Sequence, residues 1–420
     1  MSDYLPRLIE SEIAMQSEVM GCIVIEGPKW CGKSTTAKRF AKTVIELQFS
    51  DVFEKYQLLA ANNARKMLVG EKPIVFDEWQ KIPALWDAIR AEVDTTREKG
   101  QYILTGSAKP KEDKNRHSGR GRIVKIVMRP MSLWESKEST GEISLSALFK
   151  GETKISGDAK LDIDRIAFII CRGGWPEAVC MNDKNALLAA KNNFKALVEE
   201  DVTDVDEIKR DPERAKKVLR SYARQISSLA SIRTIQQDVE AGGSMDEKTL
   251  ASYINAFRKL FVIEDVLAWS PKLRSKTVIR TSPKRQYVDP SIAAQALGAS
   301  PGDLLDDVNT FGLLFESLCT RDLRIYAEKL GGTIYHYHDN KDLEADVIIH
   351  LDNGDWAAVE IKLGGHQIDE AAKNLLKLKE RIDSERMREP KFLMILTGLD
   401  YAYRRREDGV FIVPIGCLKE

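Results

Sequence analysis

Residues 27–35 read GPKWCGKST, and this stretch decides the fold of the first part of the chain. It matches the pattern GxxxxGK[ST] in full, follows the apolar run 22–26 and opens a helical pattern, which is the context that a phosphate-binding loop (P-loop) requires. The glycines let the backbone turn its N–H groups toward phosphate oxygens, and the helix N-terminus adds its positive end. The residues that we expect to hold a nucleoside triphosphate are Gly27, Pro28, Lys29, Trp30, Cys31, Gly32, Lys33, Ser34 and Thr35.

An acidic pair follows the apolar run PIVF at residues 73–76. In open α/β sheets, ligands bind at the carboxyl ends of the strands, where Asp77 and Glu78 stand. Lys33 is expected to reach the β- and γ-phosphates, while Ser34 and Asp77 would hold Mg²⁺. Glu78 would then orient and deprotonate the attacking water. The spacing predicts ATP and Mg²⁺ as ligands, and an ordinary solvated pair is the less favoured reading.

The next apolar run, QYILTGS at 101–107, ends in polar residues. Thr105 or Ser107 could sense the γ-phosphate there. Three arginines, Arg116, Arg120 and Arg122, then precede a further strand-like run. An arginine at this place could reach a neighbouring subunit's nucleotide and stabilise transition-state charge. The alternative for each arginine is a basic loop bathed in water.

Short apolar runs and amphipathic stretches alternate over the first part of the chain. Residues 22–27, 73–78, 101–107 and 122–128 are β-branched and bounded by turn or charged residues. Residues 33–47 and 83–100 have the apolar spacing of helices. Such alternation predicts an α/β fold, with a parallel sheet covered on both faces, as a P-loop core over residues 1–140.

The rest of the chain divides into three further segments. Residues 141–231 are mainly helical and are expected to form a lid or linker, and residues 232–298 read as a winged-helix-like module. The second helix of this module could enter a DNA major groove, and the basic loop from Lys272 to Arg285 could contact phosphates. The polar residues of that helix are Ser252, Asn255, Arg258 and Lys259. The alternative is a module that only packs or contacts protein.

Residues 299–420 have the pattern of a separate α/β module. The strand-like run WAAVEIK at 356–362 places Glu360 and Lys362 on one face, because side chains two residues apart in a strand point the same way. Asp346 lies on the preceding strand-like run, and Glu316 lies on a long helix before both. Three carboxylates at one sheet edge would make an oxygen-rich Mg²⁺ site, and Lys362 would help to activate a bound water. The alternative is an ordinary exposed Glu–Lys pair.

The order of motifs resembles a known group of proteins. The P-loop, FDEWQKIP, YILTGS, SGRGR, RPMSLWE and RGGWPEA together look like prokaryotic AAA+ ATPases with a C-terminal domain similar to restriction endonucleases, the PD-(D/E)xK fold. The resemblance covers nearly the whole chain and implies self-association. In that family the arginine segment has the form S-L-A-G-R, which maps onto residues 118–122 and singles out Arg122, with Arg120 as a rival. The VEIK run and Asp346 would be the two halves of the nuclease-like motif.

Composition leaves the class of partner open. The chain has 64 basic and 64 acidic residues, so a nucleic-acid role needs a local patch rather than an overall charge. Six cysteines are scattered without a CxxC pair, which fits a reducing cytoplasm. No apolar run approaches the length of a membrane span, and the N-terminus does not read as a signal peptide.

The sequence leaves three candidate functions to compare. We expect an ATPase that drives or gates a C-terminal domain that binds nucleic acid, with DNA favoured over RNA, and that could also act as a nuclease. The competing function is a signalling switch whose inactive C-terminal domain binds a protein. A small-molecule kinase is disfavoured, because kinases of that kind do not normally need an acidic pair, a sensor strand and an arginine segment in this order. Phosphate release without an acceptor substrate would separate ATPase from kinase.

Overall fold

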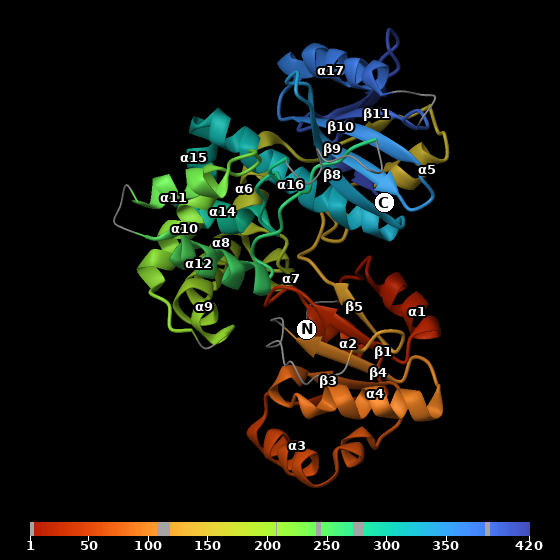
Figure 1. The fold of residues 1–420 in the computed structure, drawn as a ribbon. Helices are drawn as coiled ribbons and strands as arrows, with labels where there is room; N and C mark the ends of the chain where they lie inside the picture. The colour runs from red at the N-terminus through yellow and green to blue at the C-terminus, as the bar shows by residue number, and fades with distance from the viewer. Residues whose placement is uncertain (1–3, 107–117, 207, 241–244, 272–280, 383–386) are drawn as a thin grey trace.

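The computed structural model describes residues 4–106, 118–206, 208–240, 245–271, 281–382 and 387–420. The N-terminal part forms a lower lobe in the view of Figure 1, the helices between residues 163 and 306 gather above it on the left, and the C-terminal sheet lies at the top. The long helix α16 (Val308–Lys329) runs between the helical part and the C-terminal sheet (Figure 1).

The N-terminal lobe contains a parallel sheet with the strand order β2-β3-β4-β1-β5. Its strands are β1 (Cys22–Glu26), β2 (Thr43–Glu46), β3 (Ile74–Asp77), β4 (Tyr102–Gly106) and β5 (Ile123–Val127). The helical elements around it are α1 (Glu10–Val19), α2 (Lys33–Lys38), α3 (Ser50–Asn63), η1 (Ala64–Leu68), η2 (Trp79–Lys81) and α4 (Ala84–Thr96). Alternate residues of β1 belong to two different cores, one shared with α1 and one with α4. Both faces of the sheet are therefore covered, as predicted.

One predicted helix in this lobe was wrong. Residues 33–47 form a helix only as far as Lys38, and residues 43–46 form strand β2 instead. β2 pairs with β3 in parallel along the edge of the sheet. The β-branched residues Thr43, Val44 and Ile45 favour a pleated strand, and tertiary pairing outweighs the helical spacing of the apolar residues.

The middle of the chain is helical. Its elements are α6 (Ile163–Arg172), α7 (Pro176–Val179), α8 (Asp183–Ala196), the π-helical turn η3 (Leu197–Asp201), α9 (Val202–Asp204), α10 (Pro212–Arg224), α11 (Ile232–Glu240), α12 (Glu247–Lys259), α14 (Pro290–Leu297) and α15 (Pro301–Asp306). After α12, two isolated antiparallel bridges join Ile263 to Tyr287 and Val266 to Lys284. The winged-helix-like reading of this segment stays a prediction.

The C-terminal sheet has the mixed order β7-β12-β13-β11-β10-β9-β8. Its strands are β7 (Gly157–Asp158), β8 (Gly332–His338), β9 (Glu344–Leu351), β10 (Trp356–Lys362), β11 (Leu393–Thr397), β12 (Tyr401–Arg404) and β13 (Phe411–Pro414). Four further elements are η4 (Gly365–Gln367), α17 (Ile368–Arg381), η5 (Ile415–Cys417) and β14 (Leu418–Lys419).

Residues from the start of the predicted lid lie on this C-terminal sheet. β7 pairs with β12 at the edge of this sheet. β6 (Ile143–Ser144), which precedes α5 (Leu145–Phe149), pairs with β14 in a separate two-stranded sheet. Strands of two residues have no periodicity, so the sequence carried no signal for them. The chain therefore reaches the C-terminal sheet before it forms the helical part, and the boundaries between the four predicted domains stay predictions.

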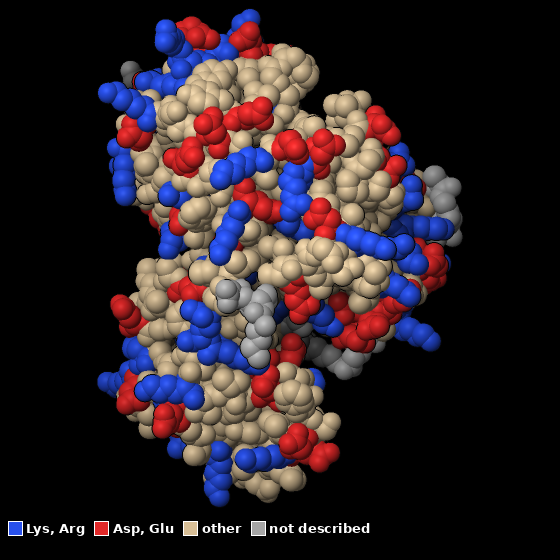
Figure 2. Space-filling model, turned by 180° about the vertical axis from the view of Figure 1, so that it is seen from behind, with Lys and Arg blue, Asp and Glu red and all other residues tan. Residues whose placement is uncertain are grey.

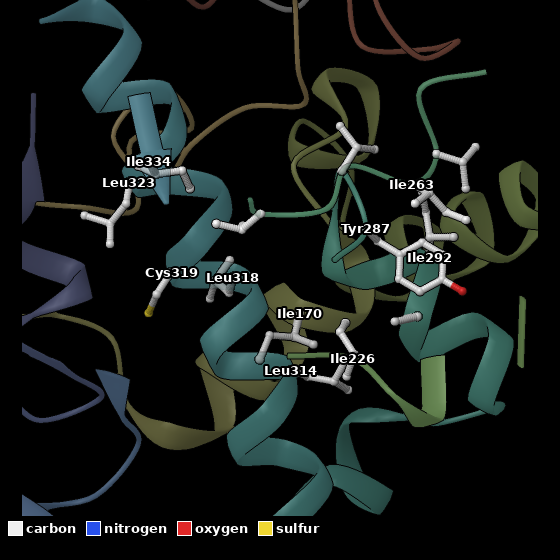
Figure 3. Close-up of a cluster of buried hydrophobic side chains, with 14 of the residues drawn as sticks. Ile170, Ile226, Ile263, Tyr287, Ile292, Leu314, Leu318, Cys319, Leu323 and Ile334 are labelled. Atoms are coloured by element: carbon white, nitrogen blue, oxygen red, sulfur yellow. The ribbon is translucent and has the colours of Figure 1, made fainter. Parts of the chain in front are cut away.

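One hydrophobic core joins the helical part to the C-terminal sheet. Figure 3 shows Ile170 of α6 and Leu314 of α16 together, with Leu323 and Ile334 farther along the same cluster. The cluster also includes Ile25 from β1, an inner strand of the N-terminal sheet. Because close-packed interiors transmit strain, a displacement in the N-terminal sheet, the helical part or the C-terminal sheet would affect the other two.

The surface carries both signs of charge. On the face shown in Figure 2, Lys and Arg are interspersed with Asp and Glu rather than gathered into one large patch of a single sign. In the part of the chain that the structure describes, no helix is long and apolar enough to cross a membrane.

Candidate nucleotide site and C-terminal acidic cluster

The P-loop lies between β1 and α2, where two of its glycines have backbone angles that other residues rarely adopt. Gly27 has φ of 149° and Gly32 has φ of 97°. A Cβ atom on Gly27 would lie 2.1 Å from the Met128 carbonyl oxygen. Glycine is therefore required at position 27 for both conformation and space.

The side chains predicted to hold Mg²⁺ and phosphate are brought together. The Ser34 hydroxyl donates a hydrogen bond to Asp77 Oδ1 over 2.7 Å, and Lys33 Nζ donates to the Pro28 carbonyl over 2.6 Å. Thr105 also donates to Asp77, because β3 and β4 place Asp77 and Thr105 opposite each other. An ionised carboxylate and a hydroxyl are ligands that Mg²⁺ prefers, so the pair of Ser34 and Asp77 fits this ion.

Glu78 follows β3 in a left-handed conformation, with φ of 57°. Its carboxylate accepts a hydrogen bond from the Gln80 side-chain amide, and the residue is half-buried. A left-handed backbone is uncommon outside glycine, Asn and Asp, and such strain gathers at functional sites. Glu78 also lines the same cleft as Lys33, which places its carboxylate beside the phosphate-binding loop.

The nucleotide cleft lies between the P-loop and helices α7 and α8. It has a volume of about 920 Å³ and is lined by Lys33, Ser34, Asp77 and Glu78. The helical part contributes Pro176, Glu177, Met181, Ala189, Asn192 and Asn193, and Gln48 completes the P-loop side. The sequence analysis missed these residues, because nothing in the local pattern of α7 and α8 marks them as facing a loop more than a hundred residues earlier.

Two P-loop side chains tie the loop to the helical part. Lys29 forms an ion pair with Asp201 on the π-helical turn η3. The Trp30 indole donates to Glu177 over 2.8 Å, and its ring stacks on Trp175 with centroids 5.9 Å apart. Burial raises the pKa of Asp201 above its usual value although Lys29 opposes the shift.

Besides Thr105, four side chains were predicted from the sensor strand and the arginine segment. Ser107 and Arg116 lie outside the described residues. Arg122 forms an ion pair with Asp94 of α4, and the backbone N–H of Arg120 bonds to Ser118.

Arg122 lies at the end of the N-terminal sheet opposite to the P-loop. Its carbonyl accepts hydrogen bonds from the N–H groups of Gly21 and Cys22, at the amino end of β1. The P-loop follows the opposite end of this strand, roughly 15 Å away at the usual rise per residue. The role of Arg122 as an arginine finger stays a prediction.

The C-terminal carboxylates are also brought together, with Lys284, a residue of the basic loop 272–285 that was predicted to contact phosphates and is buried here instead. Lys284 Nζ lies 2.7 Å from Glu316 Oε1 and 3.1 Å from Asp346 Oδ1. Lys362 Nζ lies 2.9 Å from Glu360 Oε2 and 3.4 Å from Asp346 Oδ2. The remaining contact to Asp346 is a hydrogen bond of 2.9 Å from the Ile361 N–H. Two ammonium groups thus lie among three carboxylates.

Burial and charge shift the ionisation of these carboxylates in opposite directions. Burial and the charge of Asp346 raise the pKa of Glu316 to about 7. The same two causes raise the pKa of Glu360 to about 8. Burial opposes the shift at Asp346, but Lys284 and Lys362 hold the pKa of Asp346 well below its usual value. The negative charge of the cluster is therefore concentrated on Asp346.

This arrangement differs from the predicted metal site. Among the described residues, no group of three or more His, Cys, Asp or Glu side chains is arranged to hold a metal ion. The predicted ligands Glu316 and Asp346 are bridged by the Lys284 ammonium instead. A metal ion here would have to displace a buried lysine, so the donor set as it stands does not fit Mg²⁺.

The comparisons with known proteins identify the first part of the chain. Residues 20–137 match the family model of an AAA domain. Residues 163–303 and 311–418 match two domains of unknown function, DUF8612 and DUF4143. A search of curated proteins gave no match. The predicted P-loop core thus matches an AAA domain over residues 20–137, while the nuclease-like character of the C-terminal part stays a prediction.

Two solved structures have weak likeness to the chain. The Walker-type ATPase PABY2304 of Pyrococcus abyssi is 14% identical, with a TM-score of 0.43, over 70% of this chain and 96% of that chain. A signal transduction ATPase with numerous domains and a tetratricopeptide repeat sensor, PH0952 of Pyrococcus horikoshii, is 12% identical. Its TM-score is 0.26, over 79% of this chain and 53% of that chain.

The polar residues of α12 are largely engaged within the chain. Ser252 accepts a hydrogen bond of 3.0 Å from Arg210, Arg258 lies 3.2 Å from Asp265, and Lys259 lies 3.6 Å from Asp206. Asn255 is exposed. Most of the basic loop that follows lies outside the described residues. DNA contact through α12 stays a prediction, and these ion pairs would compete with it.

Proposed function

We propose that the chain binds and hydrolyses ATP and uses the cycle to gate its C-terminal part. The observation that carries this proposal is the hydrogen bond of 2.7 Å between Ser34 and Asp77 beside Lys33, at the mouth of a cleft large enough for a nucleotide. Mg²⁺, when bound with ATP, would neutralise phosphate charge. Lys33 would bind the phosphates, and Glu78 would orient a water molecule and accept its proton.

A buried arginine supports coupling of the P-loop to the rest of the chain. Arg7 donates to the Cys31 carbonyl of the P-loop over 2.8 Å and to the Arg129 carbonyl over 2.7 Å. Its third contact is an ion pair of 3.0 Å with Glu135. A displacement of the P-loop would therefore act directly on the segment that leads out of the ATPase domain.

That segment in turn contacts α16. The Leu133 N–H donates to Asp322 over 2.9 Å, and Arg321 beside it pairs with Asp289 over 2.9 Å. Asp289 also accepts from the N–H of Gly174 over 2.9 Å, next to the tryptophan that stacks on the P-loop. Because buried charges require their partners, this network favours two alternative packings over gradual deformation.

The C-terminal part is proposed to be the element that is gated, with nucleic acid as its partner and DNA favoured over RNA. The second candidate is a signalling switch whose C-terminal part binds a protein and cleaves nothing. The buried Lys284 among the carboxylates favours a non-cleaving role in either case.

Phosphate release distinguishes these candidates. We expect Mg²⁺-dependent release from ATP without any acceptor substrate, which excludes a kinase. Stimulation by single- or double-stranded DNA would support the nucleic-acid role, and stimulation by RNA alone would reverse the preference for DNA. Release that is indifferent to all nucleic acids would favour the protein-binding switch.

A further inference from the structure

We propose that the Lys284 ammonium is the resident cation of the C-terminal acidic cluster, so that this part of the chain works without a divalent metal ion. The cluster comprises Glu316, Asp346, Glu360, Lys284 and Lys362. This inference concerns the C-terminal part alone and does not depend on ATP hydrolysis.

Lys284 is built into the fold rather than drawn in from the surface. Its N–H donates to the Val266 carbonyl over 2.9 Å, and its carbonyl accepts from the Val266 N–H over 3.0 Å. Its side chain is 9% exposed, and those of Glu316 and Asp346 are 13% and 9% exposed. The antiparallel bridge thus fixes the backbone of Lys284, and the buried carboxylates fix its ammonium group. Such a buried ion pair is a constant part of the folded structure.

Both oxygens of Asp346 and one oxygen each of Glu316 and Glu360 already contact an ammonium group. Asp346 Oδ1 accepts from Lys284, and Oδ2 accepts from Lys362 and from the Ile361 N–H. Among the buried side-chain oxygens of the cluster that the structure describes, Glu360 Oε1 has no hydrogen-bond partner. One such oxygen is far from the six or more oxygen ligands of Mg²⁺ or Ca²⁺, part of which water can supply.

An ammonium group in place of a divalent metal ion changes the chemistry that the cluster can perform. A divalent ion at such a cluster lowers the pKa of a bound water and stabilises charge on a phosphodiester. A buried ammonium is a monovalent point charge with three donors, and here it is engaged by carboxylates. The cluster therefore holds α16, β9 and β10 together around the bridge near Lys284, and it lacks the means to activate water by metal coordination.

The test is a titration of the full chain with Mn²⁺, followed by electron paramagnetic resonance of free Mn²⁺ and by melting temperature. Every protein carries Asp77→Asn, without nucleotide, so that the P-loop ligand does not contribute. With Lys284 present, we expect no Mn²⁺ site and no shift of the melting temperature. Lys284→Ala removes the cation and opens space, so it should melt lower and gain one Mn²⁺ site that restores the melting temperature.

Two variants control for packing. Lys284→Met keeps the volume without the charge, so it should also melt lower but gain no site. Lys284→Ala combined with Asp346→Asn should lose the gained site. The proposal would be overturned if the protein that retains Lys284 had a Mn²⁺ site and Asp346→Asn abolished that site. This measurement does not require that Lys284→Ala folds. A folded Lys284→Ala protein with no gain would also overturn it.

Discussion

At the residue scale, Asp77 is the side chain on which the nucleotide site converges. Two hydroxyl groups from different elements donate to the same oxygen, Ser34 from α2 and Thr105 from β4. Asp77 is buried, and a buried polar group needs hydrogen-bond partners to offset its loss of contact with water. Thr105 therefore acts first as a positioning residue for Asp77, and a role in sensing the γ-phosphate stays a prediction.

Replacing Thr105 by Val keeps the shape of the side chain and removes its donor. We expect kcat for ATP to fall by about 10-fold or more, since hydrogen bonds to charged groups contribute roughly 1.5–3 kcal/mol. Thr105→Ser should retain most of the rate. Steady-state phosphate release measures both, and equal rates for Thr105→Val and the unmodified protein would remove Thr105 from the site.

Arg7 is a second positioning residue, and its three contacts make lysine a poor substitute. Arg7→Lys keeps the charge but cannot reach Cys31, Arg129 and Glu135 together. We expect the Kd for ATP to rise several-fold and the melting temperature to fall by a few degrees. Arg39→Lys, at a half-exposed side chain, is the matched control and should change neither. Unchanged ATP affinity in Arg7→Lys would contradict a role for Arg7 at the P-loop.

At the element scale, the strands that carry chemistry could be predicted, because β1, β3, β4, β9 and β10 are apolar runs that end or begin at polar residues. β2 was missed because edge pairing outweighed helical spacing. Lys284 was missed as a member of the acidic cluster for another reason: it reaches Glu316 and Asp346 through a bridge that no local pattern encodes. The lining of the nucleotide cleft by α7 and α8 has the same origin in tertiary packing.

Strand β8 carries a buried histidine that links stability to pH. Burial, reinforced by the charge of Lys284, lowers the pKa of His336 from 6.5 to about 4. A lowered pKa means that the unfolded chain binds more protons between these values, so stability rises with pH there and is lost as pH falls through about 4. The contribution is on the order of 3 kcal/mol at most.

His336→Asn removes this titration and provides the measurement. Urea unfolding at pH 4.5 and pH 7 should show a smaller pH dependence in the variant than in the unmodified protein, whose carboxylates titrate in the same range and cancel in the comparison. An identical pH dependence in the two proteins would mean that His336 is not held neutral by the fold.

At the scale of the whole molecule, the nucleotide cleft is shared by the ATPase domain and the helical part, and the core in Figure 3 joins the helical part to the C-terminal sheet. Arg122 lies at the other end of the ATPase sheet, beside Gly21 and Cys22. One subunit thus has a nucleotide site at one end of the sheet and Arg122 at the other end. Hydrolysis that uses an arginine from a second copy would require such a separation.

Arg122→Ala tests that arrangement. An arginine that acts on a neighbour's nucleotide contributes roughly 10³–10⁵ in rate in phosphoryl-transfer systems. We therefore expect a large loss of kcat with little change in ATP affinity, and specific activity that rises with protein concentration. Arg120→Ala, at the rival arginine of the same segment, shows which of the two side chains carries the effect, and we expect the smaller loss there. Constant specific activity across a wide dilution series, with a monomer throughout, would contradict action between subunits.

The most direct test of ATP hydrolysis at the P-loop is a comparison of binding and turnover in Glu78→Gln. Binding of a fluorescent ATP analogue and release of phosphate are measured on the unmodified protein, Glu78→Gln and Lys33→Ala, each with and without Mg²⁺. Lys33→Ala should lose binding. Glu78→Gln should bind ATP as the unmodified protein does and release almost no phosphate, because the metal and phosphate ligands remain and the base is gone. Hydrolysis by Glu78→Gln at the unmodified rate would contradict the account.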